Sequence, residues 1–579
     1  MRRFLPHLAS PPILSATLAL LLYVITLRGT YIYDDVYVIL EDDRIKSPAM
    51  WAQLWTKDYN NGGADNLYRP LTSMTYAVQW WLHGEAAWAF HLVNVMVHAL
   101  ASALVAMLAM RLATHAGMNA HRTSPFAPSR DGDPRYLPVV NSHDETARPV
   151  LDAPARTFAC LAGAMFAVHP IHVEAVAGIV GRAELLCVVF GVGSLVVYLK
   201  SPLTSARAWA VWGLVLLSIL SKEQGLIVPA LIGLLAWRIR VVSRATTTDA
   251  DTSRPTTAGS DTPPTTSTAD ARPPLTNFPA QSPARRAGLL LALLLCWTVA
   301  GYIVLRESIL HLKFFWDRSF LDWSQNPLVR SDADAWLVPI SILGRYAQLL
   351  IAPVRLSIDY GGSVIGWHFR AGDPYFWMGV VVAALWAMGL LRSLLARKWV
   401  VAFCLLGFGT MYALVGNIGL IIGTIFGERL MYFPSVFIVL LMAMGLLRLP
   451  TRAGRVVACL LLILGSVRTF TYAARWNDAT AFYDRSSQEQ PQSVRLHMLV
   501  ADAARDRGDY AKAERACAAG REVLPDYFDI YSLSGEMAEQ QGKLVEARDF
   551  YQKAFDLWRN VITYQRLMRV DGLLREKKG

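Results

Sequence analysis

Apolar runs of membrane-spanning length recur along most of this chain, and they limit what it can fold into. The first run, residues 12–27, approaches the ~20 residues that a helix needs to cross the hydrocarbon core of a bilayer. Hydrophobic residues make up 54% of the 579 residues and charged residues only 17%, which is below the ~25% usual in soluble domains. Because backbone polar groups in lipid must bond internally, such runs become helices. The sequence therefore predicts an all-α, polytopic membrane protein.

About eleven transmembrane helices are predicted from these runs, and the positive-inside tendency orients them. Arg2 and Arg3 would hold the N-terminus in the cytoplasm, with the first run acting as a retained signal anchor. Basic residues between positions 448 and 455 would then also lie inside, and the C-terminal part outside. The predicted crossings cover about residues 12–30, 90–112, 158–168, 183–199, 208–220, 226–237, 287–305, 375–391, 399–415, 430–447 and 456–466.

One apolar segment, residues 337–352, does not fit this pattern. It is shorter than the ~20 residues that a spanning helix needs, and it contains Arg345. If it crossed the bilayer, the basic residues between positions 392 and 398 would face outside, against the positive-inside tendency. The segment is therefore predicted to be a re-entrant or interfacial element.

Composition divides the chain into a membrane domain, residues 1–475, and a soluble helical domain, residues 484–575. Within the membrane domain, the polar residues 113–156 are predicted to form a cytoplasmic loop. Residues 241–286 are rich in Thr, Pro, Ser and Asp and are predicted to form a disordered cytoplasmic linker. Residues 306–374 are predicted to be an outer loop that contains the re-entrant element.

The charge balance and the cysteines exclude some classes of partner. Lys and Arg number 56 against 45 Asp and Glu, a net charge of +11. In a membrane protein this excess indicates cytoplasmic loops and contact with the anionic lipid bilayer, and no nucleic acid is expected as a partner. The six cysteines show no spacing typical of a metal site or of a disulfide framework.

An internal repeat lies in the soluble part. Residues 508–514 recur as residues 542–548, which is the spacing of the tetratricopeptide repeat, about 34 residues. Such repeats stack as paired helices and form a concave surface suited to peptides. The sequence therefore predicts a C-terminal tetratricopeptide-repeat α-solenoid.

Charged and polar clusters recur where the predicted spans reach the outer face. The acidic couplet Asp34–Asp35 follows the first span, and locally it could be no more than a polar turn. An ionised side chain at bilayer depth costs at least ~2.5 kcal/mol, so a pair at the edge is either solvated or used. The other clusters are Tyr68-Arg69-Pro70-Leu71, His91 with Asn94 and His98, His169-Pro170-Ile171-His172-Val173-Glu174, Gly181-Arg182-Ala183-Glu184, Lys222-Glu223 and Glu428-Arg429 with Tyr432. Together they predict a polar cavity open to the outer leaflet.

With these motifs the sequence resembles the transmembrane and tetratricopeptide-repeat (TMTC-like) O-mannosyltransferases, and more widely the C-type (GT-C) polytopic glycosyltransferases. The likeness extends over nearly the whole chain, and the block from His169 to Glu174 is its most specific part. The resemblance implies transfer of a sugar, mannose in this family, from a polyprenyl-phosphate carrier to a Ser or Thr hydroxyl. The acceptor protein or peptide would dock on the repeat domain.

The resemblance and the chemistry assign roles to the clustered residues. An attacking hydroxyl needs a general base within hydrogen-bond reach, and Asp34 or Asp35 would supply it. The carrier phosphate is already a good leaving group, so it needs cationic stabilisation more than a strong acid. The candidate cations are Arg69, Arg182, Lys222 and Arg429, and further substrate contacts are predicted for His91, His169, His172, Glu174, Glu223 and Glu428. No cofactor is required; a divalent metal is compatible with two carboxylates and a histidine but is not implied.

Structural explanations stay open for several of these residues. His91, Asn94 and His98 share one helix face, so interhelical hydrogen bonding fits them as well as catalysis does. Likewise, structural salt bridges could account for the dipeptides Lys222-Glu223 and Glu428-Arg429.

Two other functions compete with glycosyl transfer for the whole chain. One is a non-catalytic membrane scaffold whose repeats recruit protein partners, although a scaffold needs no buried charge at so many span ends. The other is a lipid-linked-glycan transporter, which is expected to show internal symmetry and helices broken at mid-membrane. The Ala- and Arg-rich composition favours a bacterial inner membrane with the repeats in the periplasm; in a eukaryote the endoplasmic reticulum membrane is expected.

Overall fold

The computed structural model describes residues 10–59, 67–115, 153–200, 203–252, 283–311, 337–365, 372–418 and 424–577. Throughout these ranges the regular elements are helices, and no strand occurs among them. The all-α prediction is therefore confirmed for the described part of the chain.

Within the described residues, six helical segments are long and apolar enough to cross a membrane. A seventh span would be the bent pair formed by α7 and the short helices after it, whose axes differ by 50°. The six segments are Pro11–Arg28 (α2, Pro11–Tyr23, with η1), α6 (Ala87–His115), Ile179–Tyr198 (η5 with α9, Arg182–Tyr198), α12 (Pro283–Leu310), α15 (Pro374–Leu395) and Thr451–Asn477 (α18, Thr451–Ala473, with η9); the bent pair is α7 (Ala153–Val168) with Pro170–Ala177.

Shorter apolar helices complete the membrane part. They are α10 (Ser205–Ser221), α13 (Val338–Ile351), α16 (Trp399–Val415) and α17 (Pro434–Leu446). Helix α11 (Val228–Thr252) contacts α9 and α16. A helix of 13 to 17 residues extends about 20–26 Å, less than the ~30 Å hydrocarbon core. Six or seven spans are thus supported, and the count of about eleven stays a prediction.

The helices form an inner and an outer layer. Of the apolar window in the α9 segment, 89% is buried inside the protein, against only 11% for α15 and 22% for α12. The outer helices leave large apolar side chains such as Trp297, Leu385 and Leu464 uncovered, as helices that face lipid do. The charged residues at the ends of the inner helices are therefore enclosed by protein.

Some predicted loops fall partly outside the described residues. The predicted cytoplasmic loop 113–156 is bounded by α6, which ends at His115, and α7, which begins at Ala153. Helix occupies both ends of the predicted linker 241–286, because α11 ends at Thr252 and α12 begins at Pro283. The predicted outer loop 306–374 begins within α12, and its described part contains α13 and the short α14 (Gly362–Ile365).

Helix α13 corresponds to the predicted re-entrant element, and it packs against α15 through glycines. A Cβ at Gly344 would collide with the carbonyl oxygen of Tyr375, and one at Gly379 with that of Ile340. Close backbone approach of this kind is how helices associate where lipid removes the hydrophobic driving force.

The glycine contact gives a stability test. We expect Gly379→Ala to destabilise the membrane part by about 1–3 kcal/mol, because the added methyl forces the two backbones apart. Thermal unfolding in detergent measures the effect. The matched control is Gly301→Ala in α12, where a Cβ meets nothing within 4 Å, and an equal loss in both variants would contradict the packing account.

A helical region follows the membrane part. It consists of α19 (Ala479–Glu489), α20 (Val494–Arg505), α21 (Tyr510–Val523), α22 (Phe528–Gln540), α23 (Leu544–Leu557) and α24 (Val561–Glu576). The pair α22 and α23 follows the pair α20 and α21 at the spacing of the sequence repeat, so the repeat is also one of helix pairs. Gly508 and Gly542 occupy equivalent turns with φ of +76° and +73°, the left-handed conformation that commonly ends a helix.

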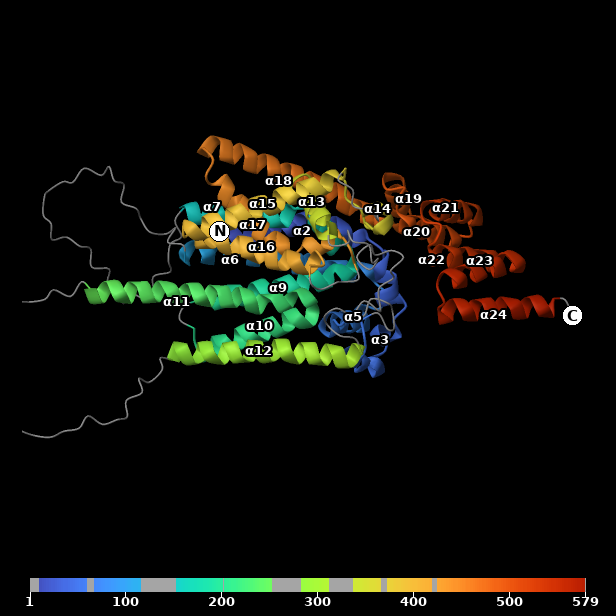
Figure 1. Cartoon of the computed structure of the whole chain (residues 1–579), viewed down its shortest axis with the longest axis horizontal. Helices are drawn as coiled ribbons and strands as arrows, with labels where there is room; N and C mark the ends of the chain where they lie inside the picture. The colour runs from blue at the N-terminus through green and yellow to red at the C-terminus, as the bar shows by residue number, and fades with distance from the viewer. Residues whose placement is uncertain are drawn as a thin grey trace, which may run out of the picture.

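This helical region lies against one end of the membrane bundle (Figure 1). One hydrophobic core runs without interruption from Tyr23 in α2 through Trp476 to Met537 in α22. Helices α23 and α24 pack around a separate small cluster. The first helices after α18 are therefore packed into the same core as the membrane part.

Candidate functional site

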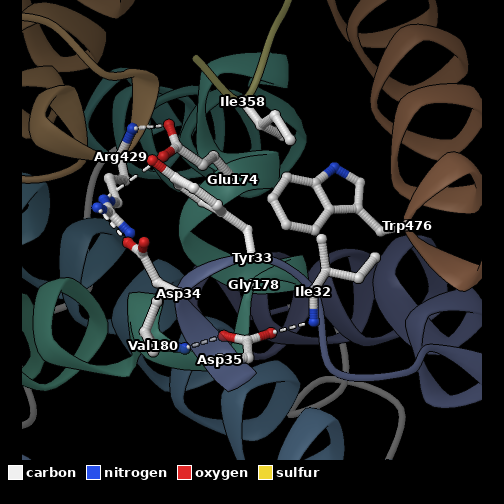
Figure 2. A pocket seen from close by; sticks show the side chains of 10 residues that line it. All are labelled: Ile32, Tyr33, Asp34, Asp35, Glu174, Gly178, Val180, Ile358, Arg429 and Trp476. Carbon is white, nitrogen blue, oxygen red and sulfur yellow. Dashed lines mark hydrogen bonds and ion pairs between the residues drawn. The ribbon is translucent and has the colours of Figure 1, made fainter. Parts of the chain in front are cut away.

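A pocket lies at the end of the bundle where the C-terminal helices attach. The space between its lining residues is about 240 Å³ when open solvent is included. The lining residues are Ile32, Tyr33, Asp34, Asp35, Glu174, Gly178, Val180, Ile358, Arg429 and Trp476 (Figure 2). Four predicted site residues, namely the acidic couplet, Glu174 and Arg429, thus meet in one place.

Asp34 belongs to a chain of charges on one side of this pocket. Its Oδ2 lies 2.8 Å from Nη2 of Arg429, and the two side chains are 30% and 21% exposed. The Nε of Arg429 also lies 3.4 Å from Oε1 of Glu174. The backbone N–H of Arg429 donates to Oε2 of Glu174 at 2.9 Å, which holds the arginine between the two carboxylates.

Asp35 points the other way, although it is the next residue (Figure 2). Its carboxylate is fully buried and accepts the backbone N–H of Val180 at 2.8 Å and that of Ile32 at 3.2 Å. Burial raises the pKa of Asp35 to about 7, although these backbone hydrogen bonds lower it in part. Asp35 therefore ties the loop after the first span to the turn before α9, while Asp34 stays accessible.

A second group of ion pairs lies in the same end of the bundle. Nη2 of Arg69 is 3.2 Å from Oε2 of Glu223, and its guanidinium lies over the ring of Tyr59 at 5.3 Å. Lys222 pairs with Glu184, and both side chains are buried. The neighbours Lys222 and Glu223 thus bind different partners, and neither lines the pocket.

Arg182 and Asn94 stabilise the break in the helices at Gly178, which lines the pocket. Its Nε donates to Oδ1 of Asn94 at 2.9 Å, and its Nη2 donates to the carbonyl of Phe90 at 3.0 Å. Nδ2 of Asn94 in turn donates to the carbonyl of Gly178 at 3.0 Å. His91 lies nearby, its Nε2 3.3 Å from the carbonyl oxygen of Thr30.

His169, His172 and Glu428 are buried and have partners of their own. His169 Nε2 is 3.0 Å from the carbonyl oxygen of Leu350, and His172 Nε2 is 2.8 Å from Oγ of Ser435. Glu428 accepts a hydrogen bond from the hydroxyl of Tyr360 at 2.6 Å and another from the backbone N–H of Ser357 at 2.7 Å. None of the three lines the pocket, and their role in substrate binding stays a prediction.

Several pocket residues were not predicted from sequence. Ile32 and Tyr33 directly precede the acidic couplet, and this position was their only signal in the sequence. Ile358 and Trp476 are uncharged and lie far from the couplet in the chain. Among the described residues, no group of three or more His, Cys, Asp or Glu side chains is placed to hold a metal.

The fold and the site define a polytopic helical membrane protein with a charged pocket at one end of its bundle. Comparison with known proteins adds its relatives. The chain is 23% identical over 512 residues to a protein O-mannosyl-transferase of Caenorhabditis elegans, covering 86% of this chain and 60% of the relative. It is 24% identical over 550 residues to the protein O-mannosyl-transferase TMTC4 of Homo sapiens, covering 88% of this chain and 66% of the relative.

A shorter match has a higher identity. The chain is 30% identical over 230 residues to the protein O-mannosyl-transferase TMTC2 of Mus musculus, covering 38% of this chain and 23% of the relative. No family model and no solved structure matches. The chain is a distant homologue of the TMTC protein O-mannosyl-transferases, which confirms the resemblance. It spans 60% to 66% of the length of the worm and human relatives.

The two aspartates should behave differently on substitution. Asp35→Asn places an amide against one of two backbone N–H groups, so at about pH 4 we expect a loss of about 1–3 kcal/mol in unfolding free energy. Thermal unfolding of purified protein measures this loss. Asp34→Asn serves as the matched control and should change stability much less, because its carboxylate is partly exposed; equal losses would contradict the bracing role of Asp35.

The raised pKa of Asp35 predicts a pH dependence. Because the folded-state pKa of about 7 exceeds the ordinary 3.8, folding favours the protonated carboxyl. That contribution to stability is complete below pH 3.8 and is lost as pH rises through about 7. The asparagine does not titrate, so the stability gap between wild type and Asp35→Asn should narrow between about pH 4 and about pH 8. A constant gap, measured by thermal unfolding across this range, would show that Asp35 does not titrate there.

Proposed function

We propose that this protein is a membrane glycosyltransferase that moves a sugar, mannose, from a polyprenyl-phosphate carrier to a Ser or Thr hydroxyl of a protein. Two observations support the proposal: the distant homology to protein O-mannosyl-transferases, and the charged pocket at the end of an apolar bundle. The observation that carries it is the partly exposed Asp34 beside Arg429. A carboxylate and a guanidinium in one pocket suit an attacking hydroxyl and a leaving phosphate, respectively.

In the proposed reaction Asp34 is the general base. The acceptor oxygen attacks the anomeric carbon, and its proton passes to the carboxylate of Asp34. The bond between that carbon and the phosphate oxygen breaks, and the carrier phosphate leaves with the bonding electrons. A single displacement of this kind inverts the anomeric configuration.

Arg429 would stabilise the departing phosphate. The carboxylate of Glu174 pairs with Nε of Arg429 and accepts the backbone N–H of Arg429, so the guanidinium stays in place when Asp34 turns to the acceptor. Preorganised charge of this kind acts without reorganisation during the reaction. Arg69 and Lys222 are already paired with Glu223 and Glu184, respectively. They would therefore affect the electrostatic potential in the pocket rather than contact the substrate.

The acceptor would approach along the C-terminal helix pairs. Their period and their glycine turns are those of tetratricopeptide repeats, whose concave faces bind peptides. These helices adjoin the pocket, since Trp476, just before α19, is part of its lining. In the proposed orientation this end of the bundle faces the periplasm, or the lumen of the endoplasmic reticulum in a eukaryote.

The test is sugar transfer by protein reconstituted in lipid nanodiscs with a polyprenyl-phosphate mannose donor and Ser/Thr peptides. We expect Asp34→Asn to lower kcat/KM by about 10²–10⁴-fold, the range for loss of a general base. Asp43→Asn, a matched change of an exposed aspartate, should leave transfer unchanged. Transfer by Asp34→Asn at the wild-type rate would exclude Asp34 as the base, and no transfer by wild type with any acceptor would favour a scaffold.

A further inference from the structure

The residue before the proposed base has an unusual backbone conformation. Tyr33 has φ of +57°, in the left-handed region that bulky residues rarely adopt. A residue persists there only when its surroundings hold it, and such strain clusters at functional sites. What holds Tyr33 therefore also determines where the carboxylate of Asp34 lies.

Two residues of the C-terminal helical region hold Tyr33. Its backbone N–H donates to the hydroxyl of Tyr483 in α19 at 2.8 Å. Its own hydroxyl accepts a hydrogen bond from Nη1 of Arg495 in α20, and that guanidinium lies 5.8 Å from the centre of the Tyr33 ring. Backbone and side chain of one residue near the start of the chain are thus fixed by two helices near its other end.

The same corner of the helical region also holds the opposite side of the pocket. Ser493, the N-cap of α20, donates from its hydroxyl to Oδ2 of Asp359 at 2.6 Å. Asp359 follows the pocket residue Ile358, and its carboxylate also accepts the backbone N–H of Gly361 at 3.1 Å. Helices α19 and α20 therefore fasten two separate segments of the pocket wall.

We propose that Tyr483 and Arg495 are positioning residues that hold Tyr33 in its left-handed conformation and so place Asp34 opposite Arg429. The helical region then does more than bind an acceptor: its first two helices complete the geometry of the pocket. The catalytic consequence rests on the function proposed for Asp34. The hold of Tyr483 and Arg495 on Tyr33, here called the clamp, does not depend on that function.

Tyr483→Phe is the sharpest test, because it removes one hydroxyl and keeps the ring. Hydrogen–deuterium exchange of the 31–37 segment reports the clamp without any sugar transfer. We expect the amide of Tyr33 to exchange faster in this variant than in wild type. The matched control is Tyr472→Phe, since the buried hydroxyl of Tyr472 has no hydrogen-bond partner among the described residues, and it should change neither exchange nor kcat.

Kinetics in the nanodisc assay distinguish a residue that places the Asp34 carboxylate from one that only stabilises the fold. Displacing the base by about 1 Å can cost up to 10²-fold, so we expect kcat of Tyr483→Phe to fall about tenfold while KM for the donor stays within about twofold. In a Tyr33→Gly background, where φ of +57° needs no clamp, Tyr483→Phe should change kcat by less than about twofold.

Wild-type exchange in Tyr483→Phe would overturn the clamp, and faster exchange with an unchanged kcat would overturn the positioning role. If wild type transfers no sugar at all, the proposed function fails. The exchange measurement still decides the clamp in that case, because it needs no substrate.

Discussion

The charged pocket depends on Arg429, because this residue separates two carboxylates that would otherwise repel each other. Asp34 and Glu174 both contact its guanidinium, and Glu174 also accepts its backbone N–H. Removing the arginine would leave both carboxylates without a counter-charge, which costs more than the ion pairs themselves contribute. The arginine therefore holds both carboxylates in place while leaving Asp34 open to the pocket. In the pairs Lys222–Glu184 and Arg69–Glu223, a cation likewise balances the charge of a largely buried carboxylate, but these pairs do not line the pocket.

Many polar residues at the span ends serve the backbone rather than a ligand. The chain between α7 and α9 is broken into short helices, and each break frees carbonyl and amide groups that lipid cannot satisfy. Asn94 donates to the carbonyl of Gly178, His172 bonds through Nδ1 to the carbonyl of Phe166, and Asp35 accepts the N–H of Val180. These bonds make an irregular segment rigid at the membrane edge. That rigidity lets Glu174, which lies within the segment, hold Arg429.

Part of this site could be predicted from the order of residues and part could not. The acidic couplet, Glu174 and Arg429 could be predicted, because each follows or precedes an apolar run. Spans of known direction bring such ends to the same side of the membrane. The different roles of Asp34 and Asp35 could not be predicted, since their partners, Arg429 and the backbone N–H of Val180, come from distant parts of the chain. The partners of Lys222 and Glu223 could not be predicted either, because ion pairs form between whichever helices pack together. Trp476 carries no charge or motif that would have marked it.

The sequence by itself determined the helical class, the apolar spans and the tetratricopeptide-like repeat, because period and hydropathy act locally along the chain. It also determined which ionisable residues stand at span ends. Only the tertiary structure decided which of them share a pocket, and that α19 and α20 pack into the core of the membrane part. Such contacts join segments far apart in the chain, and their energies come from packing and charge pairing that no local pattern encodes. The hydrogen bond from the backbone N–H of Tyr33 to the hydroxyl of Tyr483 is the clearest case, because it joins residues 450 positions apart in the chain.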